Sequence, residues 1–516
     1  MAANPPPVAI SILSHFFLPI APCPPSAAHL AEPPPEPRAP APASRLMTEA
    51  GPSEAGPSGR APAGRSGLLA WRPGREGTEA LLAGHVARAL GAEGTVEVRD
   101  AGGGKGKGAF AVRAVRAGEP LFRERPLVAM QHLRNRRQLN VCQHCFAFVG
   151  PLEAQVERLL RHRHGEVGEG AAAGLAAGLP LAGGFRRPGP VGCRGGCDAA
   201  FCSAGCADRA WEEHHRLLCP AAAKGKRKRG GEEYPGDSPL AEFYEHADLT
   251  NDIFVLAATA LAKVLARAQK LQGGTPGQAD PAEALSYVQS LTRAWAPFAT
   301  GHKAVWWDCV QAPNGEARED FVALLQRMAG DSLHLLKAAI YDVRFAPLFD
   351  LDVYSSLVGM FEMNNLALVG SSPVEAYFHH VDELEEGAEK DRVQAVTRPL
   401  LDLLDADYYQ ARSGTAFYSL QSCLNHSCVP NAEALEGAAP APGGAGQAPV
   451  ALVSALRDVA PGEELTISYI DEEMSLPERE AALADYGFLC RCPKCELESS
   501  FLCVPCEDQD RIGSAP

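Results

Sequence analysis

The hydrophobic pattern changes its period along the chain. Apolar and polar residues alternate from Thr95 to Met130, through the stretches TVEVRD, GAFAVRAV and EPLFRERPLVAM. Alternation with a period of two is typical of strands with one buried face. The pattern returns at VALVSAL (450–456) and ELTISYI (464–470), joined by a turn at Pro461-Gly462. These stretches predict strands on both sides of a long central segment.

The central segment has a helical period. Residues 248–271 place one apolar face on a predicted helix, formed by Ile253, Leu256, Ala260, Leu261, Val264 and Leu265. Lys263 and Arg267 lie within this run and argue against a membrane span. Further helical stretches are expected near 319–340 and 390–405. Separate blocks of strands and helices predict an α+β fold.

Low-complexity segments interrupt this pattern. Residues 1–90 are rich in Pro, Ala and Gly and are expected to be disordered. Residues 165–192 form a patternless insert, and residues 437–449 are expected to be a hairpin loop.

The N-terminal sequence gives no clear targeting signal. The apolar stretch 8–21 is short for a membrane span. No Lys or Arg precedes Arg38, so the basic region of a secretory signal is missing. A weak organelle signal stays open, and Met47 is an alternative start.

Composition narrows the class of protein. The chain has 516 residues, of which 46% are hydrophobic and 22% charged, as in globular proteins. The net charge of −15 disfavours general nucleic-acid binding and suits a basic protein substrate. Many of the 16 cysteines stand in short spacings. In a chain without a secretory signal, such clusters indicate metal binding in a reducing compartment.

The first cysteine-rich block holds eight candidate ligands in four pairs. They are Cys142 and Cys145, Cys193 and Cys197, Cys202 and Cys206, and His215 and Cys219. Thiolate and imidazole ligands suit tetrahedral zinc, and eight ligands predict two structural ions. In the expected cross-brace, the first and third pairs share one ion and the second and fourth share the other. Spacing alone leaves His214 as an alternative to His215.

These motifs resemble a known family. The block CQHC…CRGGCDAAFCSAGC…HHRLLC resembles a MYND zinc finger. With GKGKGAF before it and NHSCVPNAE…GEELTISYID…YGFLCRCPKC after it, the chain resembles the SMYD family of SET- and MYND-domain protein-lysine methyltransferases over residues 94–507. The insert within the finger and the short C-terminal part are similar to the family's fifth branch. The second pair, CRGGC instead of CxxC, the basic run 224–230, the long N-terminal segment and a missing acidic tail depart from that pattern.

The resemblance implies S-adenosylmethionine as cofactor. It assigns cofactor contacts to Lys105, Gly106, Lys107, Asn364, Asn425, His426, Tyr469 and Phe488. Tyr469 is the implied catalytic residue at the methyl-transfer pore, and Tyr486 the implied residue of the lysine channel. Asn364 can equally be a polar turn residue. Leu424 and Val429, which flank the tetrad NHSC, are expected in the core.

A third zinc site is implied near the C-terminus. Cys490, Cys492 and Cys495 supply three thiolates, and a structural zinc site takes four ligands. The resemblance assigns the fourth to Cys428. Cys503 and Cys506 are either a further pair of ligands or part of a frayed tail, which we favour.

The implied architecture is a SET-domain β-fold that is split by the finger and by a helical insert, and closed by a post-SET zinc clip. The expected ranges are the N-terminal segment 1–90, a split SET domain 94–470, a MYND finger 142–219, a helical insert 240–405 and a clip 484–507. We expect a cytoplasmic or nuclear monomer without membrane or nucleic-acid contacts. The run 224–229 is either a nuclear signal or a solvated loop.

The sequence is compatible with two functions. The first is a protein-lysine N-methyltransferase that acts on histones or on other basic proteins such as ribosomal ones. The alternative is a catalytically weak adaptor whose finger binds proline-containing peptides. The retained Tyr469, Asn425 and His426 favour the enzyme. The acidic stretch 382–391 either guides a basic substrate or is a solvated helix face, which we favour.

Overall fold

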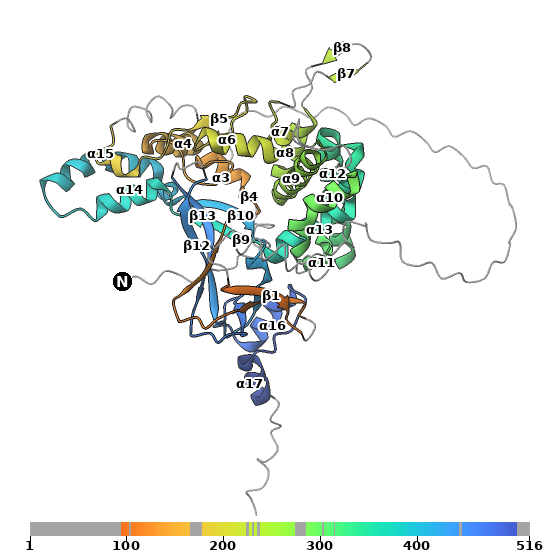
Figure 1. The fold of residues 1–516 in the computed structure, drawn as a ribbon. Coiled ribbons are helices and arrows are strands. Elements are labelled where there is room, and N and C mark those ends of the chain that lie inside the picture. Colours follow the sequence, from red (N-terminus) through yellow and green to blue (C-terminus); the bar gives the residue numbers. More distant parts are fainter. Residues whose placement is uncertain are drawn as a thin grey trace, which may run out of the picture.

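The computed structural model describes residues 94–502, except 103–104, 166–177, 223–226, 230–231, 235–237, 274–284, 302–303, 314 and 443–445. The segment 1–90, the apolar stretch 8–21 and Cys503 and Cys506 therefore lie outside the described residues. The fold is mixed α and β, with small sheets at the centre and helices on their flanks (Figure 1).

The first sheet combines strands from the N-terminal and C-terminal parts of the described chain. Its order is β1 (Val96–Asp100), β2 (Lys107–Ala111), β14 (Glu464–Ile467) and β11 (Asn425–His426). β1 and β2 form a hairpin, and Gly106 in the connection has a φ of 76°, a left-handed conformation that glycine adopts without strain. β14 pairs antiparallel with β2 and parallel with β11.

The second sheet has the order β12 (Ala432–Pro440), β13 (Gln447–Ala455) and β3 (Pro120–Glu124). The insert 437–449 was expected to be a hairpin loop. The hairpin is confirmed, but its loop is shorter than expected, because residues 437–440 and 447–449 belong to the strands. Gly437 pairs with Val450, and the ladder continues as far as Pro440 and Gln447. Backbone N–H and C=O groups supply the pairing, so the hairpin extends into a stretch of small residues without a hydrophobic pattern.

The third sheet combines a strand that precedes the helical segment with two strands that each follow helices of that segment. Its order is β4 (Val128–Gln131), β10 (Arg412–Phe417) and β9 (Leu366–Gly370). Gly414 lets the strands approach closely, because a Cβ there would lie 2.2 Å from the carbonyl oxygen of Met130. β10 leads directly to the segment that holds Asn425 and His426.

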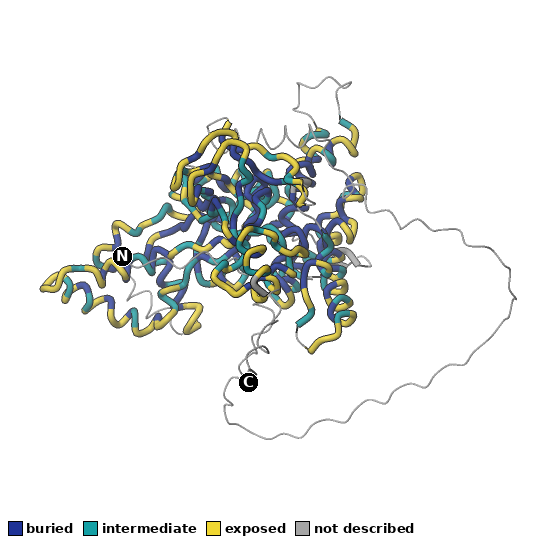
Figure 2. The backbone as a smooth tube through the Cα atoms, turned by 90° about the horizontal axis from the view of Figure 1, so that it is seen from below, coloured by how far each residue is buried: buried dark blue, intermediate teal, exposed yellow. Residues whose placement is uncertain are grey.

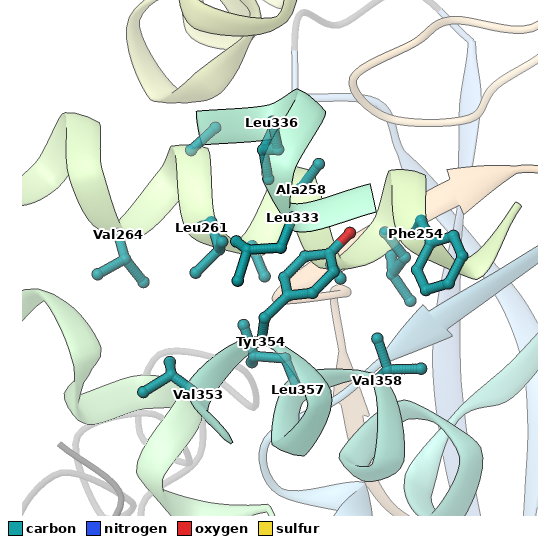
Figure 3. Packing of buried hydrophobic residues seen from close by; sticks show 14 of the residues in the cluster. Phe254, Ala258, Leu261, Val264, Leu333, Leu336, Val353, Tyr354, Leu357 and Val358 are labelled. Carbon is teal, nitrogen blue, oxygen red and sulfur yellow. The ribbon is translucent and has the colours of Figure 1, made fainter. Parts of the chain in front are cut away.

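One helical body packs around α9. It comprises α8 (Pro239–Leu249), α9 (Ile253–Gly273), α10 (Tyr287–Trp295), α11 (Trp306–Cys309), α12 (Arg318–Ile340) and α13 (Leu351–Asn364). Leu256, Leu261 and Leu336 are fully buried in its core, and Figure 3 shows how side chains of α9, α12 and α13 surround Tyr354. The predicted helix 248–271 is confirmed from Ile253 onward as α9. Its first two residues instead end α8, because the chain turns between Leu249 and Ile253.

The later helices belong to a different core. α14 (Pro373–Asp382) and α15 (Ala388–Leu404) pack with α4 (Leu152–His164). The helices within 240–405 therefore divide between two cores, with β9 between them. The acidic residues 385–386 are exposed in the connection between α14 and α15, at the tip of this helix pair (Figure 2).

The remaining elements are short. They are α3 (Leu133–Gln138), α6 (Ala204–Ala210), α7 (Arg216–Leu218), α16 (Leu476–Ala484), α17 (Pro493–Leu502), and the strand pairs β5 (Val191–Gly192) with β6 (Ala200–Phe201) and β7 (Arg227–Arg229) with β8 (Glu232–Tyr234). The basic run thus includes a strand of a small hairpin. In the described part of the chain, no helix combines the length and apolarity of a membrane span.

Candidate active site

The polar tetrad NHSC begins as a strand beside β14. Asn425 is the parallel partner of Thr466 and His426 that of Ile467, and the backbone N–H of Ser427 donates to the Ile467 carbonyl at 3.0 Å. Leu424 is buried as expected. Val429 is not, since 49% of it is exposed. The side chain of Ser427 accepts from the N–H of Val429 in a turn that buries Cys428 and leaves Val429 outside.

Upstream of the tetrad, a buried carboxylate fixes the chain. Glu124 on β3 accepts from the backbone N–H of Leu420 at 3.0 Å and from that of Gln421 at 2.9 Å. Burial raises the pKa of Glu124 to about 7. These contacts hold the segment that leads into Asn425 and His426.

Aromatic rings gather around Tyr469, just after β14. The ring centroid of Tyr469 lies 5.4 Å from that of His426, 5.1 Å from that of Tyr486 and 6.4 Å from that of Phe488. His426 and Phe488 are 5.9 Å apart. Phe488 is the most exposed of these four residues, at 37%. Residues far apart in sequence therefore form one aromatic cluster.

The hydroxyl of Tyr469 is oriented by backbone. It donates to the carbonyl oxygen of Leu424 at 2.6 Å. The pKa of Tyr469 is raised well above its ordinary value, mainly by burial and to a smaller extent by the nearby Tyr486, Cys423 and Glu464. The phenol is therefore neutral at pH 7, and its oxygen keeps lone pairs that can accept a further hydrogen bond.

The contacts of His426 define its tautomer. The backbone N–H of Tyr469 donates to Nδ1 at 3.0 Å, so Nε2 carries the proton, and Nε2 lies 3.3 Å from Sγ of Cys428. Burial and, to a smaller extent, the Arg479 guanidinium lower the pKa of His426 to about 4. The imidazole is thus neutral at pH 7.

The start of β2 lies against Asn425. The side-chain Nδ2 of Asn425 donates to the Lys107 carbonyl at 3.1 Å and to Oε1 of Glu464 at 2.7 Å. Lys105 pairs with Oε2 of Glu464 at 3.1 Å. A Cβ at Gly108 would lie 2.9 Å from the Glu464 carboxylate, so glycine is needed for this approach.

Asn364 ends α13. Its Nδ2 donates to the Met360 carbonyl within the same helix at 2.7 Å. Two residues earlier, Glu362 accepts from Nε1 of Trp306 at 3.1 Å. Burial raises the pKa of Glu362 to about 7. The pKa of Tyr486 is raised by burial, then by Asp485 and by Glu362. The end of α13 therefore places a carboxyl group near the aromatic cluster.

The first cysteine-rich block forms two four-ligand groups. One contains Cys142, Cys145, Cys202 and Cys206, and the other contains Cys193, Cys197, His215 and Cys219; within each, all ligand atoms lie within 4.8 Å of one another. The Cys145–Cys202 and Cys193–Cys219 sulfur pairs are 3.6 and 3.7 Å apart. Tetrahedral zinc, with bonds to sulfur of about 2.3 Å, places two thiolates about 3.8 Å apart, so both groups could hold zinc.

The geometry distinguishes the two histidines. Nε2 of His215 lies 3.2 Å from Sγ of Cys193 and 3.3 Å from Sγ of Cys197. Nδ1 of His214 is buried without a hydrogen-bond partner among the described residues, and His214 is outside the group. The pairing of the four ligand pairs is that of the cross-brace expected from spacing.

The third group joins the tetrad to the C-terminal segment. Cys428, Cys490, Cys492 and Cys495 have their sulfurs within 4.8 Å, and the Cys428–Cys495 pair is 3.6 Å apart. Nη2 of the buried Arg479 lies 3.6 Å from Sγ of Cys495 and 2.7 Å from Oε2 of Glu498. A cation beside four thiolates offsets their excess negative charge when a divalent ion is bound.

Sequence reasoning missed three contributors to the site: the carboxylate of Glu464, the carbonyl of Leu424 and the guanidinium of Arg479. Glu464 stands in the motif GEELTISY, but its contact with Asn425 depends on a parallel pairing between strands almost 40 residues apart. A backbone carbonyl carries no sequence signal. Arg479 lies in an ordinary amphipathic helix.

Comparison with known proteins identifies the family. The SET domain family matches residues 106–470. The chain is 38% identical over 450 residues to the histone-lysine N-methyltransferase ATXR2 of Arabidopsis thaliana, covering 78% of this chain and 91% of that protein. It is 29% identical over 417 residues to the human protein-lysine N-trimethyltransferase SMYD5, covering 78% and 87%. The resemblance to SMYD-type enzymes is confirmed, and the chain belongs to the SET-domain family as a protein-lysine N-methyltransferase.

Proposed function

We propose that the protein transfers a methyl group from S-adenosylmethionine to a lysine side chain of a basic protein, such as a histone or a ribosomal protein. The observation that carries the proposal is the aromatic cluster of His426, Tyr469, Tyr486 and Phe488, with Asn425 next to His426 on β11. Their ring distances and the oriented Tyr469 hydroxyl are the parts that such a reaction needs.

The residues present fit the cofactor. Among the described residues, both hydrogen bonds of the Asn425 side chain are made by its nitrogen, Phe488 is partly exposed, and Gly108 leaves room for close approach. In this proposal Lys105, Gly106, Lys107, Asn364, Asn425, His426, Tyr469 and Phe488 line the cofactor site. When bound, S-adenosylmethionine supplies an electrophilic methyl group on a sulfonium.

The chain's own part is to prepare the amine. A free lysine has a pKa of about 10.4 and is protonated at pH 7. The rings of Tyr469 and Tyr486 exclude water and disfavour the charged form, which lowers that pKa. Because the Tyr469 hydrogen is directed to the Leu424 carbonyl, its oxygen can accept an N–H of the neutral amine. The nitrogen lone pair is then free to face the methyl group, and catalysis is mainly by positioning.

We further propose that the three ligand groups hold structural zinc. Residues 142–219 are then a MYND finger with two ions, and residues 484–507 a post-SET clip with one. The split SET domain spans 94–470, and the helical insert 240–405. The clip would attach Tyr486 and Phe488 to the tetrad through Cys428. We place the protein in the cytoplasm or nucleus.

The test is direct. Purified protein is titrated with S-adenosylmethionine in a calorimeter and incubated with the labelled cofactor, core histones and ribosomal proteins. The proposal expects saturable cofactor binding and label on lysine side chains. Cofactor binding without transfer to any protein would favour the adaptor function, in which the finger binds proline-containing peptides. Absence of cofactor binding would overturn the proposed function.

A further inference from the structure

The side-chain amide of Asn425 has a fixed orientation. Its Nδ2 carries two hydrogens, and two acceptors lie within reach, Oε1 of Glu464 at 2.7 Å and the Lys107 carbonyl at 3.1 Å. A flipped amide would place Oδ1 against a carboxylate and a carbonyl, where no donor is available. The chemistry of these neighbours therefore turns the amide nitrogen inward and leaves the oxygen for a ligand.

The carboxylate of Glu464 is itself held in place. Its Oε2 pairs with Nζ of Lys105 at 3.1 Å, and the Glu464 side chain is only 19% exposed. On β14, Glu464 lies two positions before Thr466, the parallel partner of Asn425, so the side chains of Glu464 and Thr466 point to the same face. The absence of a side chain at Gly108 makes room for the contact.

We propose that Glu464 is a positioning residue for the cofactor, which sets the Asn425 oxygen outward as an acceptor for the ammonium group of the methionine part. This inference rests on the proposed function, in which Asn425 contacts S-adenosylmethionine. Lys105 then acts through Glu464, by pairing with its second oxygen. Because S-adenosylhomocysteine carries the same ammonium group, Glu464 serves the binding of substrate and product cofactor alike.

A donor–acceptor exchange tests the orientation. In Asn425→Asp, a second carboxylate faces Glu464, and both ligands should bind at least about tenfold more weakly. When Asn425→Asp is combined with Glu464→Gln, the new amide can donate to the introduced carboxylate, whose other oxygen still accepts from the ligand. The double variant should regain about tenfold over Asn425→Asp. The recovery is partial, because the Lys107 carbonyl then faces an acceptor.

Each variant is measured by calorimetry with S-adenosylmethionine and with S-adenosylhomocysteine, alongside its melting temperature and zinc content. Glu464→Gln alone keeps an acceptor for Asn425 but loses the ion pair with Lys105, so its affinity should fall less than that of Glu464→Ala. In Glu464→Ala the acceptor is lost, and both ligands should bind more weakly, with a raised KM for the cofactor and a largely retained kcat. Glu463→Gln is the matched control, since Glu463 accepts from Asn431 at 3.0 Å in the same manner.

Two results would overturn the inference alone. One is a double variant that binds no better than Asn425→Asp although its melting temperature and zinc content are those of the wild type. The other, which serves if Asn425→Asp fails to fold, is an unchanged affinity in folded Glu464→Ala. A wild-type protein that binds neither ligand would overturn the proposed function together with the inference.

Discussion

Nε2 of the His426 imidazole lies 3.3 Å from Sγ of Cys428. Its other nitrogen accepts the backbone N–H of Tyr469. One ring therefore touches both the residue at the proposed methyl-transfer pore and a member of the third ligand group. This explains a run of polar residues at the edge of a core. Asn425 contacts Lys107 and Glu464, His426 belongs to the aromatic cluster, and Cys428 lies in one ligand group with the cysteines that follow Tyr486 and Phe488.

The first prediction follows from this link. Cys428→Ser should remove one zinc, loosen residues 486–495 and weaken S-adenosylmethionine binding at least about tenfold, because a structural metal site is coupled to local folding. Zinc counting, calorimetry and hydrogen exchange of that segment measure the three effects. Cys202→Ser is the control, which should lose an ion of the finger and keep its cofactor affinity. Wild-type affinity in Cys428→Ser that has lost one zinc would show that the clip does not shape the site.

The second prediction concerns metal content. The three groups contain twelve ligands in total, four in each, and tetrahedral structural sites take four ligands. Elemental analysis of the purified protein should therefore give three zinc ions per chain, and chelation should lower its melting temperature. One zinc or none would contradict the assignment of these cysteines.

Much of this arrangement could be read from the sequence, and the remainder could not, for physical reasons. Alternation identifies strands such as Val96–Asp100, since it records which face is buried. Alternation does not show which strands pair, so the parallel pairing of Asn425 with Thr466 could not be predicted. The hairpin continued through Gly437 without apolar side chains because backbone groups alone form the ladder. The exposure of Val429 is set by a local turn that residue hydrophobicity does not encode.

The third prediction is a pH dependence of stability. Burial raises the pKa of Glu362 from 4.5 in an unfolded chain to about 7 in the folded protein. Below 4.5 both states are protonated, and its contribution to stability is complete. Between 4.5 and about 7 the folded state holds more protons, so this contribution falls as pH rises and then levels off.

Glu362→Gln should remove that dependence. The new amide oxygen can still accept from Trp306, so the hydrogen bond is kept while the titrating group is lost. Between pH 5 and 8, approximately the window of this group, the midpoint of urea unfolding should fall less in the variant than in the wild type. Parallel curves for the two proteins would show that Glu362 titrates normally.

The central claim is that the Tyr469 hydroxyl orients the lysine amine, and Tyr469→Phe tests it most directly. The control is Tyr354→Phe, which also loses a buried hydroxyl contact, to Ser332 at 2.8 Å, but lies in the helical body. Wild type and both variants are incubated with labelled S-adenosylmethionine and a fractionated proteome, and labelled lysines are identified by mass spectrometry. Tyr469→Phe should methylate the identified lysine at least about a hundredfold more slowly at nearly unchanged cofactor affinity, while Tyr354→Phe should keep its turnover. Unchanged turnover in Tyr469→Phe would contradict the claim.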